Sequence, residues 1–201
     1  MSGTANGGTE NGGTAEPPAI VTPLRLHRTS VIPEWVDYNG HLSEAYYVLI
    51  FGHATDALMD ALGMDAAYRK RTGRSLYTVD ARIRYLLEVH QGEGLEVRTW
   101  IAGADAKRLL VVHRMHRLPA SGAGKSASDP IAETELVLLS VGPSADRPNP
   151  QAMPFEALVR ARIRRIAAAH LDSAPALPGR WTPPERQAER RANHREAPMP
   201  T

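Results

Sequence analysis

Polar and apolar residues follow a strand-like pattern in five runs of the chain. The first run alternates enough to form a strand, and the other four have the composition and spacing of longer strands. The runs are residues 24–32, 75–89, 94–104, 108–118 and 131–141. Pro33 ends the first, Gly92 and Gly94 separate the second from the third, and Ala106 and Lys107 form the next turn. Short links between neighbouring strands predict an antiparallel meander.

Two other stretches have helical spacing. Residues 45–62 include six consecutive apolar or aromatic residues at 46–51, so the first half of this helix is apolar nearly all round. We therefore expect it to be enclosed, with Ser43 as its N-cap and Gly63 as its end. Residues 155–171 place apolar side chains on one face, which predicts a second, amphipathic helix.

The order of these elements predicts an α+β fold in which a curved antiparallel sheet wraps around a central buried helix, with a further helix at the C-terminal end. This is the hot-dog architecture. We expect one domain over residues 20–171. The tails at 1–19 and 172–201 are expected to be disordered, because the first is low in complexity and the second is rich in Pro and Arg. One such sheet leaves an edge open, so we expect a homodimer or homotetramer.

Composition excludes several classes of site and partner. The chain has no cysteine, which rules out disulfides, thiolate metal sites and a cysteine nucleophile. No segment has the ~20 apolar residues of a membrane helix, and the N-terminal residues lack the apolar core of a signal peptide. We therefore expect a cytoplasmic protein with no membrane partner. Residues 156–201 carry nine arginines and five acidic residues, but no nucleic-acid-binding motif, so no nucleic-acid partner is expected.

Reactive side chains are densest just before the apolar helix. Asp37, Asn39 and His41 lie within five residues, and the following helix offers unpaired N–H donors and the positive end of its dipole. The carboxylate can activate water or attack directly, and the helix donors can stabilise an oxyanion. Composition alone also fits a simple turn. Asn39-Gly40 is a strong hairpin signal, although a helix follows it here in place of a strand.

The Asp-x-Asn-x-His spacing at residues 37–41 resembles the hot-dog thioesterase superfamily, and in particular its plant acyl-carrier-protein thioesterases. The resemblance implies that Asp37 is the catalytic carboxylate and that Asn39 and His41 belong to the same site. It also implies a glutamate on the following long strand, which matches Glu88 in the run YLLEVHQGEGLEV. From its position alone, Glu88 is equally well explained as a solvent-facing carboxylate at a strand end.

A closer resemblance covers roughly residues 24–171 and rests on the runs PEWVDYNGH, EAYY, SLYTVDARIRYLLEV and DAKRLL. These are similar to thioesterases of bacterial carnitine and betaine catabolism, some of which are fused behind carnitine dehydrogenase. The resemblance implies hydrolysis of betainyl-CoA or a related short acyl-CoA, without a cofactor. The sequence departs from that pattern at Ser43, where Asn is common, and at Asp80, where Glu is common.

Aromatic residues are concentrated in the same part of the chain. Nine of the eleven Phe, Trp and Tyr residues lie between Trp35 and Trp100. The faces of such rings attract quaternary ammonium groups, and a betainyl group carries one. The candidates to line a substrate pocket are Trp35, Tyr38, Tyr46, Tyr47, Tyr77 and Tyr85. The alternative for each ring is ordinary packing around the helix.

The remaining candidates are cationic or imidazole side chains. Lys107 and Arg108, at a turn beside a strand, are candidates to bind a CoA phosphate, with ordinary surface charge as the alternative. His53 falls within the apolar helix and is interpreted as a core or interface residue. His113 and His116 are three apart on a strand and face opposite sides, so that strand forms no two-histidine metal site, and no metal is expected.

Three functions are candidates for these residues. The leading hypothesis is hydrolysis of a short acyl-CoA. Enoyl-CoA hydratases of the same fold have a His five residues after the Asp and a Pro after the Asn, whereas here His41 follows Asp37 by four and Gly40 takes the Pro position. A non-catalytic acyl-CoA-binding regulator would need an output module, and residues 1–23 are too short and too polar to form one.

Overall fold

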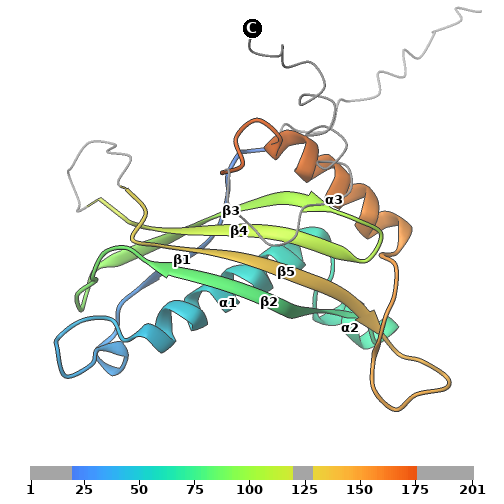
Figure 1. Ribbon diagram of the computed structural model, residues 1–201, viewed down its shortest axis with the longest axis horizontal. Coiled ribbons are helices and arrows are strands. Elements are labelled where there is room, and N and C mark those ends of the chain that lie inside the picture. Colours follow the sequence, from blue (N-terminus) through green and yellow to red (C-terminus); the bar gives the residue numbers. More distant parts are fainter. Residues whose placement is uncertain (1–19, 120–128, 176–201) are drawn as a thin grey trace, which may run out of the picture.

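The computed structural model describes residues 20–119 and 129–175 (Figure 1). In chain order its elements are β1 (Leu24–Ser30), the 3-10 helix η1 (Pro33–Trp35), α1 (Glu44–Leu62), α2 (Ala66–Thr72), β2 (Ser75–Tyr85), β3 (Gly94–Ala104), β4 (Arg108–Arg117), β5 (Ala132–Gly142), β6 (Gln151–Ala152) and α3 (Ala157–His170). All five predicted strands and both predicted helices are present. The predicted tails, apart from residues 172–175, lie outside the described residues, as does most of the loop at 120–130.

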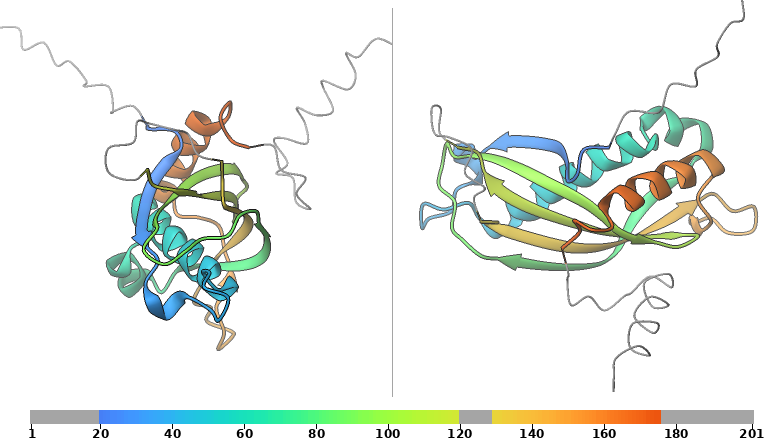
Figure 2. Two further views of the ribbon diagram at one scale, coloured as in Figure 1. Left: turned by 90° about the vertical axis from the view of Figure 1, so that its left-hand side faces the viewer. Right: turned by 90° about the horizontal axis from the view of Figure 1, so that it is seen from above.

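The long strands form one antiparallel sheet in the order β1-β3-β4-β5-β2, and the short β6 pairs with β5. Seen end-on, the sheet curls around α1, and α3 lies next to the β1 and β3 side of the sheet (Figure 2). This is the predicted arrangement of a curved sheet on a central helix. Strand β2 ends the order, so one of its edges has no partner strand among the described residues.

Helix α1 buries one face against the concave side of the sheet. Ile50 and Leu58 are fully buried there, and Gly63 ends the helix with a left-handed φ of 77°. The expectation of complete enclosure is wrong for the outer face, where Val48 and Leu49 are 48% and 41% exposed. The reason is geometric, because the sheet of a single chain covers only one side of the helix.

Helix α3 packs on the same core beside the C-terminal half of α1. Ile163 lies in one apolar cluster with Leu62, and the Arg162 guanidinium donates to the Leu62 carbonyl at 3.1 Å. At the other end of α3, the buried ring of His170 accepts a hydrogen bond from the Ile101 N–H at 2.9 Å. These contacts fix α3 against both α1 and β3.

Three short elements, η1, α2 and β6, were not predicted. Helix α2 has seven residues and β6 has two, lengths at which periodicity carries little signal. The start of α2 does have a recognisable cap, because the Asp65 carboxylate accepts a hydrogen bond from the Tyr68 N–H at 2.8 Å. Asp65 was therefore the signal available in the sequence.

A histidine lies in the core between α1 and the sheet. His113 is fully buried, with Thr55 Oγ1 at 3.1 Å from its Nε2 and Thr99 Oγ1 at 2.9 Å from its Nδ1. Thr55 also donates to the Phe51 carbonyl at 3.0 Å, so His113 Nε2 is the donor to Thr55 and Nδ1 accepts from Thr99. Burial, and then the nearby His27, lower the pKa of His113 from 6.5 to about 3, which keeps the ring neutral.

Candidate active site

The segment from Val36 to Leu42 is a tight turn that leads into α1. Val36 and Leu42 form an antiparallel bridge, and the Gly40 N–H donates to the Asp37 carbonyl at 3.0 Å. Gly40 has a φ of 83°, a conformation that glycine adopts without steric cost. The hairpin signal of Asn39-Gly40, discounted because a helix follows, is therefore real: the chain makes both the turn and the helix.

Asp37 organises this turn from within. Its Oδ1 accepts hydrogen bonds from the backbone N–H groups of Asn39, at 2.8 Å, and His41, at 3.4 Å. Because one oxygen fixes the backbone, the carboxylate is held in place relative to His41. Among the described residues nothing donates a hydrogen bond to the other oxygen, which leaves it available for water or substrate.

A loop from a distant part of the chain lies against the turn. The Leu42 N–H donates to the Val89 carbonyl at 2.7 Å, and His41 and His90 form an antiparallel bridge. Arg117 holds this loop, since its guanidinium donates to a Glu93 carboxylate oxygen at 2.9 Å and to the Glu88 carbonyl. This pairing brings the Glu88 carboxylate to 3.4 Å from His41 Nε2.

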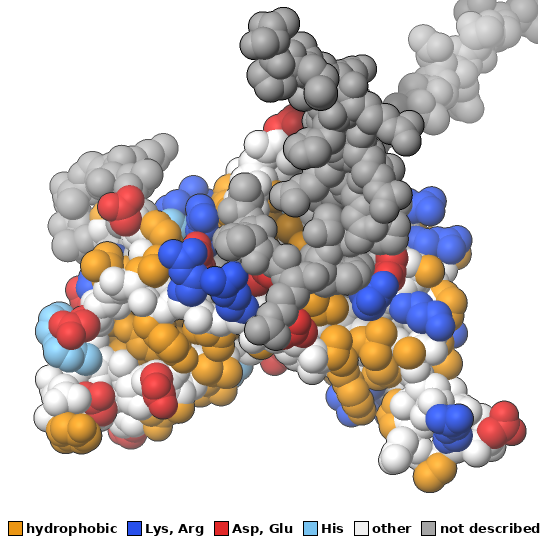
Figure 3. Space-filling model, viewed as in Figure 1, with side chains coloured by type: hydrophobic (Ala, Val, Ile, Leu, Met, Phe, Trp, Pro, Cys, Tyr) orange, Lys and Arg blue, Asp and Glu red, His pale blue; other side chains and the backbone are white. Residues whose placement is uncertain are grey.

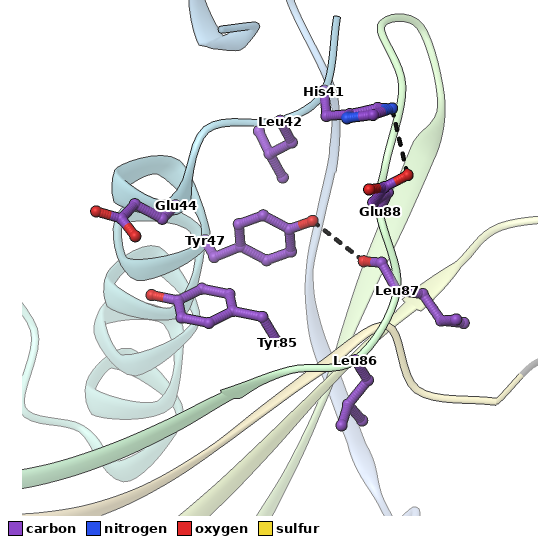
Figure 4. A pocket seen from close by; sticks show the side chains of 8 residues that line it. All are labelled: His41, Leu42, Glu44, Tyr47, Tyr85, Leu86, Leu87 and Glu88. Atoms are coloured by element: carbon purple, nitrogen blue, oxygen red, sulfur yellow. Dashed lines mark hydrogen bonds and ion pairs between the residues drawn. The ribbon is translucent and has the colours of Figure 1, made fainter. Parts of the chain in front are cut away.

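A cavity of about 310 Å³ opens where the turn, the loop and the first turns of α1 meet (Figure 4). Its lining residues are His41, Leu42, Glu44, Tyr47, Tyr85, Leu86, Leu87 and Glu88. The buried Tyr47 hydroxyl donates to the Leu87 carbonyl at 3.3 Å, and the Tyr47 and Tyr85 rings meet edge to face at 5.2 Å. The pocket therefore has aromatic walls held in fixed positions.

The electrostatics of the pocket come from carboxylates and a helix end. Glu44 and Glu88 line it, together with His41. Ser43 is the N-cap residue of α1, as expected, but its side chain makes no capping hydrogen bond. The Tyr46 N–H donates to the Ser43 carbonyl at 3.0 Å, so the Glu44 and Ala45 N–H groups are the amides of the first turn that keep their donor capacity. Burial, followed by the charge of Glu44, raises the pKa of the Tyr85 hydroxyl above its usual value.

The structure places the other candidate rings elsewhere. Tyr47 and Tyr85 line the pocket. Trp35 stacks on Tyr46 with ring centroids 5.5 Å apart, and Tyr38, at the tip of the turn, is 98% exposed.

Tyr77 and the two proposed phosphate-binding residues lie at the far end of the sheet. Tyr77 and Arg108 both pair with Leu139, about 26 Å along β2 from Tyr85. Arg108 forms an ion pair with Asp105 at 2.7 Å, and the Lys107 N–H donates to the same carboxylate. Within one chain, therefore, this turn and the pocket do not meet.

The sequence interpretation missed four of the lining residues, Leu42, Glu44, Leu86 and Leu87, and Glu44 is the charged one among them. An acidic residue in the first turn of a helix is usually explained by its favourable interaction with the helix dipole, so the sequence alone did not mark Glu44 as a site residue.

In the described parts of the chain, no three His, Cys, Asp or Glu side chains are placed to hold a metal ion. None of the described helices has the length and apolar character needed to cross a bilayer.

Comparison with known proteins identifies the family. Residues 31–163 match the model of the thioesterase-like superfamily. The chain belongs to this family. It is 44% identical over 147 residues to the betainyl-CoA thioesterase of Pseudomonas aeruginosa, covering 73% of this chain and 86% of that protein. It is also 45% identical over 139 residues to the L-carnitine dehydrogenase/betainyl-CoA thioesterase of Agrobacterium fabrum, covering 69% of this chain but 26% of that longer protein.

Solved structures agree with the family. A provisionally assigned thioesterase of Pseudomonas putida KT2440 superposes with a TM-score of 0.63 at 37% identity, covering 81% of this chain and 97% of that one. A Staphylococcus aureus protein solved in complex with CoA has the same TM-score at 18% identity, covering 81% and 93%, and shows likeness of fold alone. The predicted hot-dog fold and the predicted enzyme class, a thioester hydrolase acting on acyl-CoA, are confirmed.

Proposed function

We propose that this thioesterase acts on a short acyl-CoA, with betainyl-CoA as its substrate, and releases betaine and CoA. The observation that carries the proposal is the pocket at the start of α1, where two distant segments bring His41 and Glu88 together. The acyl group is taken from the Pseudomonas aeruginosa relative, which is named for betainyl-CoA. A thioester seated here would meet the His41 imidazole, the Glu88 carboxylate and uncapped amides at the start of α1. Asp37 is not among the lining residues, but it lies in the same turn as His41, whose N–H donates to its carboxylate.

Asp37 is the proposed base or nucleophile. Its free oxygen can take a proton from water, so that hydroxide adds to the thioester carbon. Alternatively, the same oxygen adds to that carbon and gives a mixed anhydride, which water then opens. In both routes the C–S bond breaks, CoA leaves as a thiolate that takes up a proton, and the acyl group leaves as a carboxylate.

The remaining groups are proposed to position the reaction. The uncapped amides of the first turn of α1 would hold the oxyanion that forms on the carbonyl oxygen. Asn39 and His41 would orient water or the thioester. Glu88, at 3.4 Å from His41, would orient the imidazole. Lys107 and Arg108 stay candidates to bind a phosphate of CoA. The CoA would be bound in the pocket of a second chain, because the pocket of the same chain is too distant.

The proposed active form is a homodimer or homotetramer in the cytoplasm, where CoA thioesters are made and used. Strand β2 ends the sheet, and Tyr77 and Val79 on it are 46% and 54% exposed. Figure 3 shows apolar side chains along the lower margin of the sheet, over β2. Tyr85 and Leu87 line the pocket and are each 48% exposed, so pairing of β2 with a second copy would also cover the pocket mouth.

Replacement of Asp37 by Asn tests the proposed reaction. The amide oxygen of Asn can still accept the two turn hydrogen bonds, so the melting temperature should stay within a few degrees of wild type. Thiol release from betainyl-CoA should fall ~10²–10⁴-fold, the usual loss with a general base. Asp60→Asn, an exposed change near the far end of α1, is the control. Near-normal turnover by Asp37→Asn would remove Asp37 from the mechanism, and no thiol release by wild type would refute the substrate.

A further inference from the structure

We infer that Glu44, with the rings of Tyr47 and Tyr85, forms a subsite for a quaternary ammonium group at the acyl end of the substrate. The inference rests on the proposed function, because it assigns the residues that would select the acyl group of the thioester. In this arrangement Glu44 selects the acyl group, whereas His41 and Glu88 position the groups that react.

The charges of the residues that line the pocket favour a cation, and Arg117, whose charge acts on the Tyr47 hydroxyl, is paired with Glu93. No Lys or Arg is among the lining residues of the pocket, all of which belong to the described part of the chain. Of the two lining carboxylates, Glu88 lies at 3.4 Å from His41. Glu44 forms no ion pair with any residue that the structure describes. An acyl group that ends in a carboxylate would be repelled here, whereas a cation would meet an unpaired negative charge.

The aromatic walls fit an ammonium group that cannot donate a hydrogen bond. The hydroxyl of Tyr47 is tied to the Leu87 carbonyl, so its ring cannot turn away. Tyr85 meets that ring at 85° and is 48% exposed, so part of its π surface is open. The charge of Glu44 acts on the Tyr85 hydroxyl, so this ring and that carboxylate are close enough to act on one bound cation.

The layout of the pocket fits a short acyl group. Figure 4 shows the two rings between Glu44 on one side and His41 with Glu88 on the other. In a betainyl group the carbonyl carbon and the nitrogen are two bonds apart, roughly 2.5 Å. A carbonyl beside His41 would therefore place the three methyl groups against the rings, on the side of Glu44. One small pocket can then hold both the reacting bond and the charge.

Two substrates of the same shape separate charge from fit. Betainyl-CoA and 3,3-dimethylbutanoyl-CoA differ only in whether a positive nitrogen or a neutral carbon carries the three methyl groups. For wild type, kcat/KM should be higher for betainyl-CoA, and the preference should shrink as salt rises, because Glu44 is exposed. Glu44→Gln should lower kcat/KM for betainyl-CoA roughly three- to thirtyfold and change the neutral substrate less than about twofold.

Two further variants complete the kinetic test. Tyr85→Leu should reduce the preference roughly two- to thirtyfold by removing one ring face. Asp56→Asn removes one exposed charge from the same helix, about 18 Å further along, and should change neither substrate. A preference that survives in both Glu44→Gln and Tyr85→Leu would overturn the subsite. Equal or faster hydrolysis of the neutral substrate by wild type would overturn it as well.

A binding measurement keeps this inference distinct from the proposed function. The probe is a CoA thioether that carries the trimethylammonium group and cannot be hydrolysed, compared by calorimetry with its neutral carbon analogue. If wild type hydrolyses neither thioester, the proposed function fails. Tighter binding of the charged thioether, lost in Glu44→Gln, would still support the subsite, and equal binding of the two thioethers would refute it.

Discussion

The buried imidazole of His113 should make the fold sensitive to mild acid. The folded ring has a pKa of about 3, whereas in the unfolded chain the value returns to its usual 6.5. Between these two pH values the unfolded chain takes up a proton that the folded chain does not bind. The contribution of His113 is therefore fully present above pH 6.5 and is lost progressively as the pH falls.

The size of the effect follows from the two pKa values. Because pH 5 lies about 1.5 units below the pKa of this ring in the unfolded chain, protonation of the unfolded state lowers the free energy of unfolding by about 2 kcal/mol. A domain of this size has a total of ~5–15 kcal/mol, so the loss is a substantial fraction of it. Burial also lowers the pKa values of His27 and His170, which adds to the trend in the same direction.

Urea denaturation at pH 7.5 and pH 5 measures this loss. The variant His113→Gln keeps hydrogen-bonding capacity toward Thr55 and Thr99 but cannot titrate. When the pH is lowered from 7.5 to 5, the decrease in the free energy of unfolding should be about 2 kcal/mol smaller for this variant than for wild type. The variant will have its own stability at pH 7.5, so the comparison concerns the change with pH. An identical change in both proteins would refute the reasoning.

Two further predictions concern the turn and the assembly. Gly40→Ala adds a side chain in open space at a φ of 83°, so the only cost is the strain of placing an alanine in a left-handed backbone conformation. The free energy of unfolding should fall by ~1–2 kcal/mol, and the variant should melt a few degrees lower. Gly52→Ala, equally free of contacts but inside α1, should instead be stabilising, and a matching loss there would contradict the backbone explanation. Sedimentation at micromolar concentration should show at least a dimer for wild type and a shift toward monomer for Val79→Lys on the β2 edge. Leu158→Lys, on the exposed face of α3, should leave the assembly intact, and a monomeric wild type would disprove the pairing.

The elements of the fold could be predicted because their signals are local. The run at 94–104 became β3 with the same ends, and Gly63 stopped α1 where expected. The end of β2 was missed because its cause is distant in sequence. The N–H groups of Leu86 and Leu87 both donate to the Ile131 carbonyl, and this turns the chain away from the sheet at a point where the sequence stays apolar.

The candidate site divides in the same way. The spacing of Asp37, Asn39 and His41 is local, and the turn that holds them follows from that spacing. The importance of Glu44 depends on Tyr85, which arrives from about forty residues away on β2. The exposed side of α1 could not be predicted from an apolar run either, because covering it requires a surface that a single chain does not supply.

The walls of the pocket project from the ends of elements whose inner parts form the core. Glu44 stands on the first turn of α1, whereas Ile50 and Leu58 of the same helix are fully buried. Tyr85, Leu86 and Leu87 are exposed residues at and just beyond the end of β2. Substitutions at these surface positions would alter the acyl group that fits while leaving buried packing untouched. Substrate preference can therefore drift over evolutionary time at little cost in stability, which makes this corner of the sheet a natural place for new acyl specificities to arise and for engineering to begin.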